Sequence, residues 1–261
     1  MNEQAIGEAA AILWKNWSEQ SRIGGLPLRC RPAHRAEGYA VQAEVARQSG
    51  QKVVGWKIAA TSAAGQAHIG VDGPLAGRLL SERVLHPSTR IGLESNIMKV
   101  AEAEFAFLIG RPLPKRGHPY SVEEVVAAVA SLHPAIEVPD SRYEDFVHVD
   151  VAQLIADMAC ACWFLLGPPT KADWRGQDLV THAVTAHLND SLVGEGAGAN
   201  VLGDPRVALT WIANELCNYG DGLVAGDVVT TGTCVKPVPV VPGDRVRVDF
   251  GEFGMMEANF G

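Results

Sequence analysis

The sequence predicts an α+β fold, with a small helical N-terminal region (residues 1–50) packed on a β-rich domain (residues 51–261). Residues 3–20, with apolar residues near helical spacing, predict a helix at the start of the chain, and residues 34–48 look like a second. From residue 227 to the end, short strand-like runs are separated by Gly, Pro and Asp. Helices and strands do not alternate regularly, so a doubly wound parallel sheet is not expected.

The middle of the chain is expected to mix strands with inserted helices. Ser121, followed by Glu124, forms a capping box that begins a helix over 121–133. Asp204 and Pro205 begin another helix over 204–222. The remaining expected elements are strands over 53–60, 133–140 and 179–190, a short helix within 61–70, and a helix-like segment over 155–167.

The composition excludes several classes of function. The 22 basic and 30 acidic side chains give a net charge of −8, whereas nucleic-acid and anionic-membrane surfaces need a basic patch. The N-terminus resembles no secretory leader, and no run approaches the ~20 apolar residues of a membrane span. The five cysteines are odd in number and form no CxxC pair. We therefore expect buried, reduced thiols in a cytoplasmic protein with no nucleic-acid or membrane partner.

Residues 100–110, VAEAEFAFLIG, have the composition of a buried strand but contain Glu102 and Glu104. Side chains alternate between the faces of a strand, so both carboxylates point the same way, about 6–7 Å apart. A solvated strand face is one interpretation, and a shared divalent cation that removes the repulsion is the other. Glu137, a lone acid in the apolar run PAIEVPD, favours the cation. Three carboxylates without Cys or His suit Mg²⁺ or Mn²⁺.

Five segments, in consistent order along the chain, are similar to one known family. They are GWKIAATSAAGQAHIGV (55–71), VAEAEFAFLIGRPLP (100–114), HPAIEVPDSRYEDF (133–146), IADMACACWFLLG (155–167) and VVTTGTCVKPVPVVPGDRVRVDFGEFGMMEANF (228–260). Together they resemble the 2-keto-4-pentenoate (2-hydroxypentadienoate) hydratase and 4-oxalocrotonate decarboxylase family, within the fumarylacetoacetate-hydrolase-like superfamily. The resemblance implies a β-rich catalytic domain with an N-terminal helical region. It also implies a homo-oligomeric, metal-dependent lyase that adds water to a 2-hydroxy-2,4-dienoate to give a 4-hydroxy-2-oxo acid.

The resemblance also implies roles for particular residues. Glu102, Glu104 and Glu137 would be ligands of Mg²⁺ or Mn²⁺, which binds a 2-oxo or 2-enol acid through its C1 carboxylate and C2 oxygen. Lys57 would lie in the pocket and move a proton or hold the substrate, with a snorkelling or ion-paired lysine as the alternative. Residues expected near the substrate are Ser62, Gln66, Asp140, Arg142, Thr231, Gly232 and Thr233.

Each of these further residues has a structural alternative. Ser62 and Gln66 would serve as a helix cap and a surface residue, and Asp140 and Arg142 would form an ion-paired turn. The segment 230–233 would be an ordinary Gly-containing turn. The histidines, including His68, lack the HExxH spacing of metal sites and are expected to be ordinary surface or core residues.

Two positions depart from the family pattern. Leu75 stands where the hydratases are expected to have an acidic residue, and Met158 stands where they are expected to have asparagine. Both changes replace a polar group with an apolar one and put the hydration step in question. The competing hypotheses are decarboxylation or C–C cleavage of a related 2-oxo acid such as 4-oxalocrotonate, a substrate with a bulkier apolar tail, and a silent protein that binds metal and keto acid without turnover.

Overall fold

The computed structural model describes all 261 residues. Its α-helices are α1 (Glu3–Ser18), α2 (Arg35–Ser49), α3 (Ala63–His68), α4 (Val122–Ala128), α5 (Val151–Ala156) and α6 (Pro205–Tyr219). Its 3₁₀ helices are η1 (Leu28–Cys30), η2 (Ser81–Arg83), η3 (Phe146–His148), η4 (Met158–Cys160), η5 (Gly198–Asn200) and η6 (Gly251–Phe253). The two helices expected near the N-terminus are confirmed as α1 and α2.

Fifteen strands complete the secondary structure. They are β1 (Val53–Ala59), β2 (Leu75–Leu80), β3 (Val84–Leu85), β4 (Arg90–Ile91), β5 (Val100–Ile109), β6 (Leu113–Pro114), β7 (Val129–Val138), β8 (Trp163–Leu166), β9 (Ala183–Leu188), β10 (Ser191–Ala197), β11 (Gly222–Leu223), β12 (Val228–Thr233), β13 (Val238–Pro239), β14 (Arg245–Asp249) and β15 (Met255–Phe260). The strands expected over 53–60, 133–140 and 179–190 are thus present as β1, part of β7 and β9.

The strands form one large and one smaller sheet. The eight-stranded sheet has the order β2-β1-β12-β5-β7-β8-β3, with β13 also paired to β5. The five-stranded sheet has the order β10-β9-β14-β15-β4, and β6 pairs separately with β11. In the large sheet β5 lies between β12 and β7 and pairs antiparallel with both.

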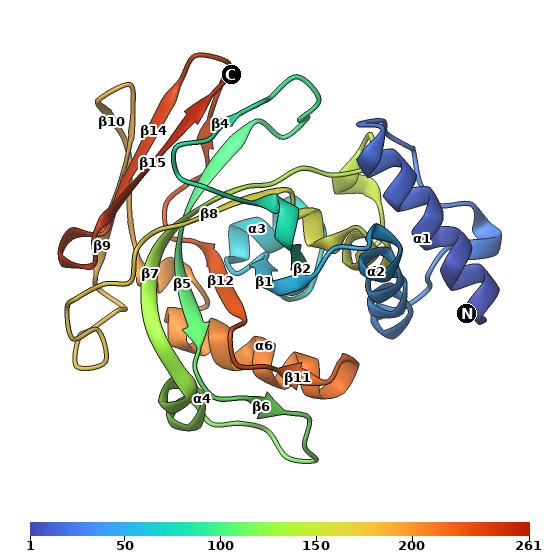
Figure 1. Ribbon diagram of the computed structural model, residues 1–261, viewed down its shortest axis with the longest axis horizontal. Coiled ribbons are helices and arrows are strands. Elements are labelled where there is room, and N and C mark those ends of the chain that lie inside the picture. The colour runs from blue at the N-terminus through green and yellow to red at the C-terminus, as the bar shows by residue number, and fades with distance from the viewer.

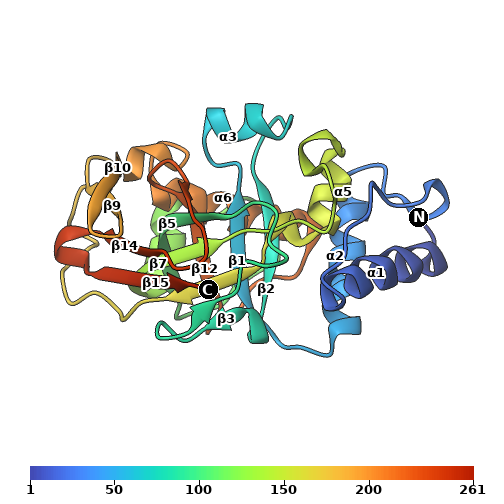
Figure 2. The same ribbon diagram turned by 90° about the horizontal axis from the view of Figure 1, so that it is seen from above.

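The N-terminal helices, the large sheet and the five-stranded sheet form three layers that lie side by side along the longest axis of the molecule. Figure 1 shows α1 and α2 at one end, the five-stranded sheet at the other and the large sheet between them. Figure 2 shows α3 projecting from the end of β1, away from the sheet. The elements that carry the expected site residues therefore lie in the middle of the molecule.

Two apolar clusters hold these layers together. One joins the two sheets, and in it the ring of Phe105 on β5 meets that of Phe250 at 5.0 Å between centroids. The other joins Leu13 of α1 and Val41 of α2 to Phe164 of β8. The N-terminal helices thus bury their apolar faces against the large sheet.

The helix expected over 121–133 is shorter in the structure. Its capping box is present, with the Ser121 side chain accepting from the backbone N–H of Glu124, but α4 ends at Ala128. The Ala128 carbonyl accepts hydrogen bonds from the backbone N–H groups of Gly110 and Arg111. The apolar run after Glu124 fits the period of a helix as well as that of a strand. Its later part becomes the strand β7 because it pairs with β5.

The helix-like assignment of 155–167 is wrong. Helix α5 ends at Ala156, and Met158, Ala159 and Cys160 have φ values of 54°, 49° and 62°. Left-handed backbone costs a non-glycine residue roughly 1–2 kcal/mol, so this turn must be held by its surroundings. The carboxylate of Asp157 accepts from Ser141 Oγ at 2.7 Å and the backbone N–H of Arg142 at 3.0 Å, which draws the chain out of the helical path.

No helix of the protein combines the length and hydropathy needed to cross a membrane. All five cysteines are free and buried, as expected from the sequence.

Candidate active site

Three carboxylates from two neighbouring strands meet in the large sheet. Glu102 and Glu104 lie on β5, Glu137 lies on β7, and the antiparallel register places Glu102 directly opposite Glu137. One oxygen from each carboxylate lies within 4.8 Å of the others. Strand pairing therefore adds a third carboxylate to the two that share a face of β5.

The two buried carboxylates are only partly hydrogen-bonded. Glu104, 1% exposed, accepts from the backbone N–H of Gly232 at 2.7 Å and from the Thr230 hydroxyl. Glu137, 0% exposed, accepts from Lys57 Nζ at 3.1 Å. Each of the two keeps one buried oxygen, Oε1, without a hydrogen-bond partner. Unsatisfied buried oxygens are unfavourable, so this donor set fits a bound cation.

The chemistry of the donor set agrees with a hard divalent metal. Mg²⁺ and Ca²⁺ prefer carboxylate oxygens, whereas thiolate and imidazole ligands suit softer metals. The cluster of Glu102, Glu104 and Glu137 contains neither Cys nor His. These residues fit a divalent metal ion.

Burial and mutual repulsion raise the pKa values of these acids. Burial first, and then the charge of Glu102, raise the pKa of Glu104 to about 7. Burial also raises the pKa of Glu137 well above its usual value, and the neighbouring carboxylates add to this effect. Lys57 opposes both shifts, but one ammonium cannot offset three clustered carboxylates.

Lys57 is buried at 3% exposure on β1, beside the carboxylates. Burial lowers the pKa of its ammonium, but Glu137, Glu102 and Glu104 raise it by more, so the net pKa is above the usual value. Lys57 is therefore an ion-paired lysine inside the site, and its ammonium does not reach the surface.

The segment 230–233 at the end of β12 shapes the same site. Gly232 has φ +98°, and a Cβ there would lie 1.9 Å from Thr61 Oγ1. Only glycine fits this conformation and this close approach. This conformation of Gly232 lets its backbone N–H donate a hydrogen bond to the Glu104 carboxylate.

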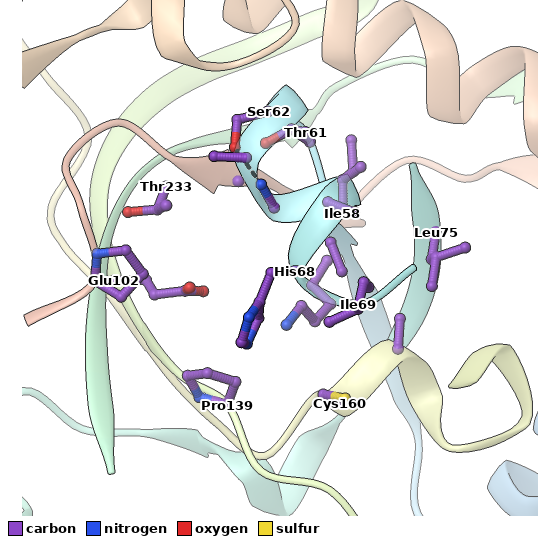
Figure 3. A pocket seen from close by; sticks show the side chains of 18 of the residues that line it. Ile58, Thr61, Ser62, His68, Ile69, Leu75, Glu102, Pro139, Cys160 and Thr233 are labelled. Atoms are coloured by element: carbon purple, nitrogen blue, oxygen red, sulfur yellow. Dashed lines mark hydrogen bonds between the residues drawn. The ribbon is translucent and has the colours of Figure 1, made fainter. Parts of the chain in front are cut away.

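Of these groups, Lys57, Glu102 and Gly232 line a cavity of about 640 Å³. Figure 3 shows Glu102 and Thr233 on one side of it and Ile58, Ile69 and Leu75 on the other. Its lining includes Lys57, Ser62, Glu102, Gly232 and Thr233.

Several residues expected near the substrate lie elsewhere. Gln66 is outside the lining and donates to the Ala60 carbonyl at 3.1 Å. The Thr231 hydroxyl donates to the Phe105 carbonyl at 3.0 Å. Asp140 pairs with Arg22 and lines a separate pocket of about 110 Å³. Ser62 lines the cavity, but its hydroxyl caps α3 by accepting from the backbone N–H of Gly65 at 3.0 Å.

Arg142 stabilises the backbone next to the cavity. Its buried guanidinium donates to the carboxylate and the carbonyl of Asp157 and to the Ala161 carbonyl, the last at 2.9 Å. These bonds bracket the left-handed turn at 158–160, whose residues Ala159 and Cys160 line the cavity. The ion-paired interpretation of Arg142 describes its position in the structure.

His68, expected from the sequence to be an ordinary surface or core residue, lies on the cavity wall at the end of α3. Figure 3 shows its imidazole between Glu102 and the Leu75 side of the cavity. The sequence feature that could have indicated a place for His68 at the site is its position inside the matched segment 55–71. The departure at Leu75 also lies on the wall, whereas Met158 packs in the cluster under the N-terminal helices.

The fold and the site define a class of protein. Residues 30–260 match the model described as fumarylacetoacetate (FAA) hydrolase C-terminal. The chain belongs to the fumarylacetoacetate hydrolase family, and the expected α+β architecture with N-terminal helices is confirmed.

Within this family the chain is similar to two groups of enzymes. It is 35% identical over 228 residues to 4-oxalocrotonate decarboxylase from Pseudomonas sp. (strain CF600), covering 86% of this chain and 85% of that protein. It is 34% identical over 259 residues to 2-keto-4-pentenoate hydratase 1 from Dechloromonas aromatica (strain RCB), covering 97% and 96%. The structure of 4-oxalocrotonate decarboxylase from Pseudomonas putida G7, complexed with magnesium and adipate, matches with a TM-score of 0.90 at 30% identity, covering 100% of this chain and 99% of that one.

Proposed function

We propose that this protein is a metal-dependent hydro-lyase that adds water to a 2-hydroxy-2,4-dienoate (2-oxoenoate) to give a 4-hydroxy-2-oxo acid. The observation that carries this proposal is the cluster of three carboxylates, two of them with an unpartnered buried oxygen, beside Lys57 on a cavity. Relatives named 2-keto-4-pentenoate hydratase, 34% and 33% identical over 97% of the chain, support the reaction.

Glu102, Glu104 and Glu137 would hold the cation, for which we propose Mg²⁺ or Mn²⁺. Three protein ligands leave coordination positions for a substrate. When bound, the cation supplies positive charge that orients a 2-oxo acid by its C1 carboxylate and C2 oxygen and stabilises negative charge on that oxygen. The magnesium of the Pseudomonas putida G7 decarboxylase structure supports a cation of this kind.

The protein side chains would orient the substrate and move its protons. The enol hydrogen leaves the C2 oxygen and C5 gains a hydrogen, after which water adds a hydrogen at C3 and a hydroxyl at C4, so no oxidant is needed. Lys57 Nζ, beside Glu137, would hold the negative charge of the acid and exchange a proton with it. Ser62, Gly232 and Thr233 would contact the acid from the cavity wall, whereas Gln66, Asp140, Arg142 and Thr231 support the surrounding backbone.

His68 would orient or deprotonate the water that adds at C4, because its imidazole stands between the carboxylate side and the apolar side of the cavity. His68→Asn should lower turnover by about 10²-fold, the lower end of the range for a lost general base. Binding of a 2-oxo acid inhibitor should change little. His118→Asn, at an exposed histidine outside the cavity, is the matched control. Equal activity of the two variants would remove His68 from the mechanism.

The test is turnover of 2-hydroxypenta-2,4-dienoate by the Mg²⁺- or Mn²⁺-loaded protein. Hydration removes the conjugated chromophore without releasing gas, and mass spectrometry should show a product heavier by one water. Loss of absorbance should depend on the metal. Absence of a hydrated product with either metal would overturn the proposed activity.

A second candidate, decarboxylation or C–C cleavage of a related 2-oxo acid such as 4-oxalocrotonate, is favoured by Leu75. This side chain gives the far wall an apolar surface in place of an acid. An apolar wall offers no hydrogen bonds and therefore destabilises a carboxylate that is to be lost as CO₂. Release of CO₂ from 4-oxalocrotonate, without hydration of the dienoate, would decide for this candidate.

We also propose that the protein is a homo-oligomer in the cytoplasm. Leu192, Val193 and Met255 on the five-stranded sheet are 53%, 48% and 55% exposed, and β10 is an edge strand of that sheet. Exposed apolar residues at a sheet edge favour association. The five free, buried thiols support a reducing compartment. Light scattering of the purified protein measures the subunit count.

A further inference from the structure

The two sides of the cavity differ in chemistry. Glu102 is on one side and Ile58, Ile69 and Leu75 are on the other (Figure 3). Leu154 and Ala159 also line the cavity, and Ile58, Leu75, Leu154 and Ala159 are each at most 1% exposed. The side of the cavity that Ile58, Ile69 and Leu75 form, which we call the far end, is therefore apolar.

The lining of the cavity contains few charged residues. They are Lys57, Glu102 and Lys236, with His68 between the two sides. Lys57 is hydrogen-bonded to Glu137. Lys236 lies between Thr233, which is paired with Glu104, and Val238, which is paired with Ala101. None of the residues labelled on the far side, Ile58, Ile69 and Leu75, is a cation that could receive a second carboxylate of a substrate.

The cavity is also large for a short acid. A volume of about 640 Å³ corresponds to about 20 water molecules in the liquid, at about 30 Å³ each. An unsubstituted five-carbon dienoate would fill well under half of this space. Water would occupy the remainder against Ile69 and Leu75, which is unfavourable for an apolar wall.

We propose that the preferred substrate is a monocarboxylic 2-hydroxydienoate or 2-oxoenoate that carries an apolar substituent, alkyl or aryl, at the end distant from C1. This inference rests on the proposed function for the orientation of the acid, with C1 and C2 at the carboxylate cluster. Ile69, Leu75 and Leu154 then select the tail. Each buried methylene should tighten binding roughly four-fold. A distal carboxylate should weaken binding, because it would lose its hydration without gaining a hydrogen-bond or ionic partner.

The experiment is calorimetric titration of the Mg²⁺-loaded protein with 2-oxo acids that are not substrates. Pyruvate, 2-oxobutanoate and 2-oxohexanoate vary the tail, and 2-oxoadipate matches 2-oxohexanoate in length but adds a distal carboxylate. We expect 2-oxohexanoate to bind at least ten-fold more tightly than pyruvate and also more tightly than 2-oxoadipate. Equal affinities, or tighter binding of 2-oxoadipate, would overturn the apolar-tail proposal while leaving the metal site standing.

Two variants locate the selectivity on the far wall. Ile69→Lys, at a partly exposed position, should reverse the preference and favour 2-oxoadipate over 2-oxohexanoate. Leu75→Asp should weaken binding of 2-oxohexanoate and leave pyruvate unchanged, while Leu28→Asp, at a residue 83% exposed, should alter neither. Because Leu75→Asp can impair folding, Ile69→Lys decides if that variant is insoluble. An unchanged preference in Ile69→Lys would contradict the proposal, and failure of every 2-oxo acid to bind would overturn the proposed function itself.

Discussion

Lys57 is a buried ammonium whose hydrogen-bond partner, Glu137, is one of the three clustered carboxylates. A lysine in an apolar strand has no packing use that a methionine could not serve, so its charge must act on the site. The unpartnered oxygens of Glu104 and Glu137 have the same implication, since a buried oxygen without a donor is unfavourable unless a ligand binds it.

Lys57→Met should leave the fold largely intact and lower turnover by at least ~10²-fold, the usual scale for a lost proton-transfer group. Metal affinity should remain largely unchanged, because the three carboxylates are retained. The measurement is kcat with saturating Mg²⁺, alongside calorimetric metal binding. Lys52→Met, at an exposed lysine just before β1, is the matched control. Activity within a few-fold of wild type in Lys57→Met would reduce this lysine to a structural ion pair.

At the scale of elements, the end of β12 and the strand β7 deliver the polar groups of the site. The backbone N–H of Gly232 reaches Glu104 because glycine tolerates both the left-handed conformation and the proximity of Thr61. Strand β7 carries Glu137, and four residues earlier it carries the buried His133. Both elements are therefore sensitive to single substitutions.

Gly232→Ala should lower the free energy of unfolding and weaken metal binding. A Cβ would lie 1.9 Å from Thr61 Oγ1, and overpacking of this kind typically costs about 1–3 kcal/mol in addition to the backbone strain. Gly243→Ala is the control, because Gly243 has a similar φ of +99° with no atom within 4 Å of the added Cβ. Urea unfolding should show a larger loss for Gly232→Ala, and equal losses would refute a steric role for Thr61.

Because of the buried His133 on β7, we expect the free energy of unfolding to depend on pH. Its Nδ1 donates to the Gly167 carbonyl and its Nε2 accepts from Ser131 Oγ, each at 2.8 Å, so the neutral ring is satisfied. Burial lowers the pKa of His133 in the folded protein. The stabilisation is thus complete above the ordinary value of about 6.5 and declines as pH falls below it, because the unfolded chain takes up the proton first.

Urea unfolding of wild type and His133→Asn should show a difference in stability that narrows between about pH 7.5 and pH 5. His118→Asn, at an exposed histidine, should show no such trend. A difference that stays constant with pH would mean that His133 is not the titrating group.

For the whole molecule, the proposed metal site would be a source of stability, because Glu102, Glu104 and Glu137 belong to two central strands of the large sheet. Metal binds the folded site and not the unfolded chain, so it stabilises by mass action. In the metal-free protein the clustered carboxylates repel one another, and burial raises the pKa of Glu104 to about 7.

Mg²⁺ or Mn²⁺ at 100 times its Kd should add about 2.7 kcal/mol, or roughly 5–10 °C in Tm for a chain of this size. In Glu102→Gln and Glu104→Gln this rise should shrink or vanish, and activity should fall with it. The metal-free variants should be at least as stable as metal-free wild type, because one repulsive charge is removed. Glu82→Gln, at an exposed residue outside the cluster, should retain the full rise. An unchanged rise in Glu102→Gln and Glu104→Gln would contradict the assignment of the metal site.

The local chemistry of the site could be predicted from the sequence, because it depends on neighbours in the chain. Period-two alternation places Glu102 and Glu104 on one face of a strand, and the capping patterns at Ser121 and Asp204 begin helices where the structure has them. The prediction failed where a segment fits two periods. The residues after Ala128 continue as a strand because β5 is available to pair with them.

What only the tertiary structure decided is the geometry by which distant groups meet. The register of β5 with β7 sets Glu137 opposite Glu102, and the pairing of β1 with β12 brings Lys57 level with Thr230. The same folding places His68 and Leu75 on one cavity and turns Arg142 toward Asp157. Strand alternation and capping act over a few residues and can be read locally. Strand register and cavity shape arise from contacts between segments far apart in the chain, which no local pattern encodes.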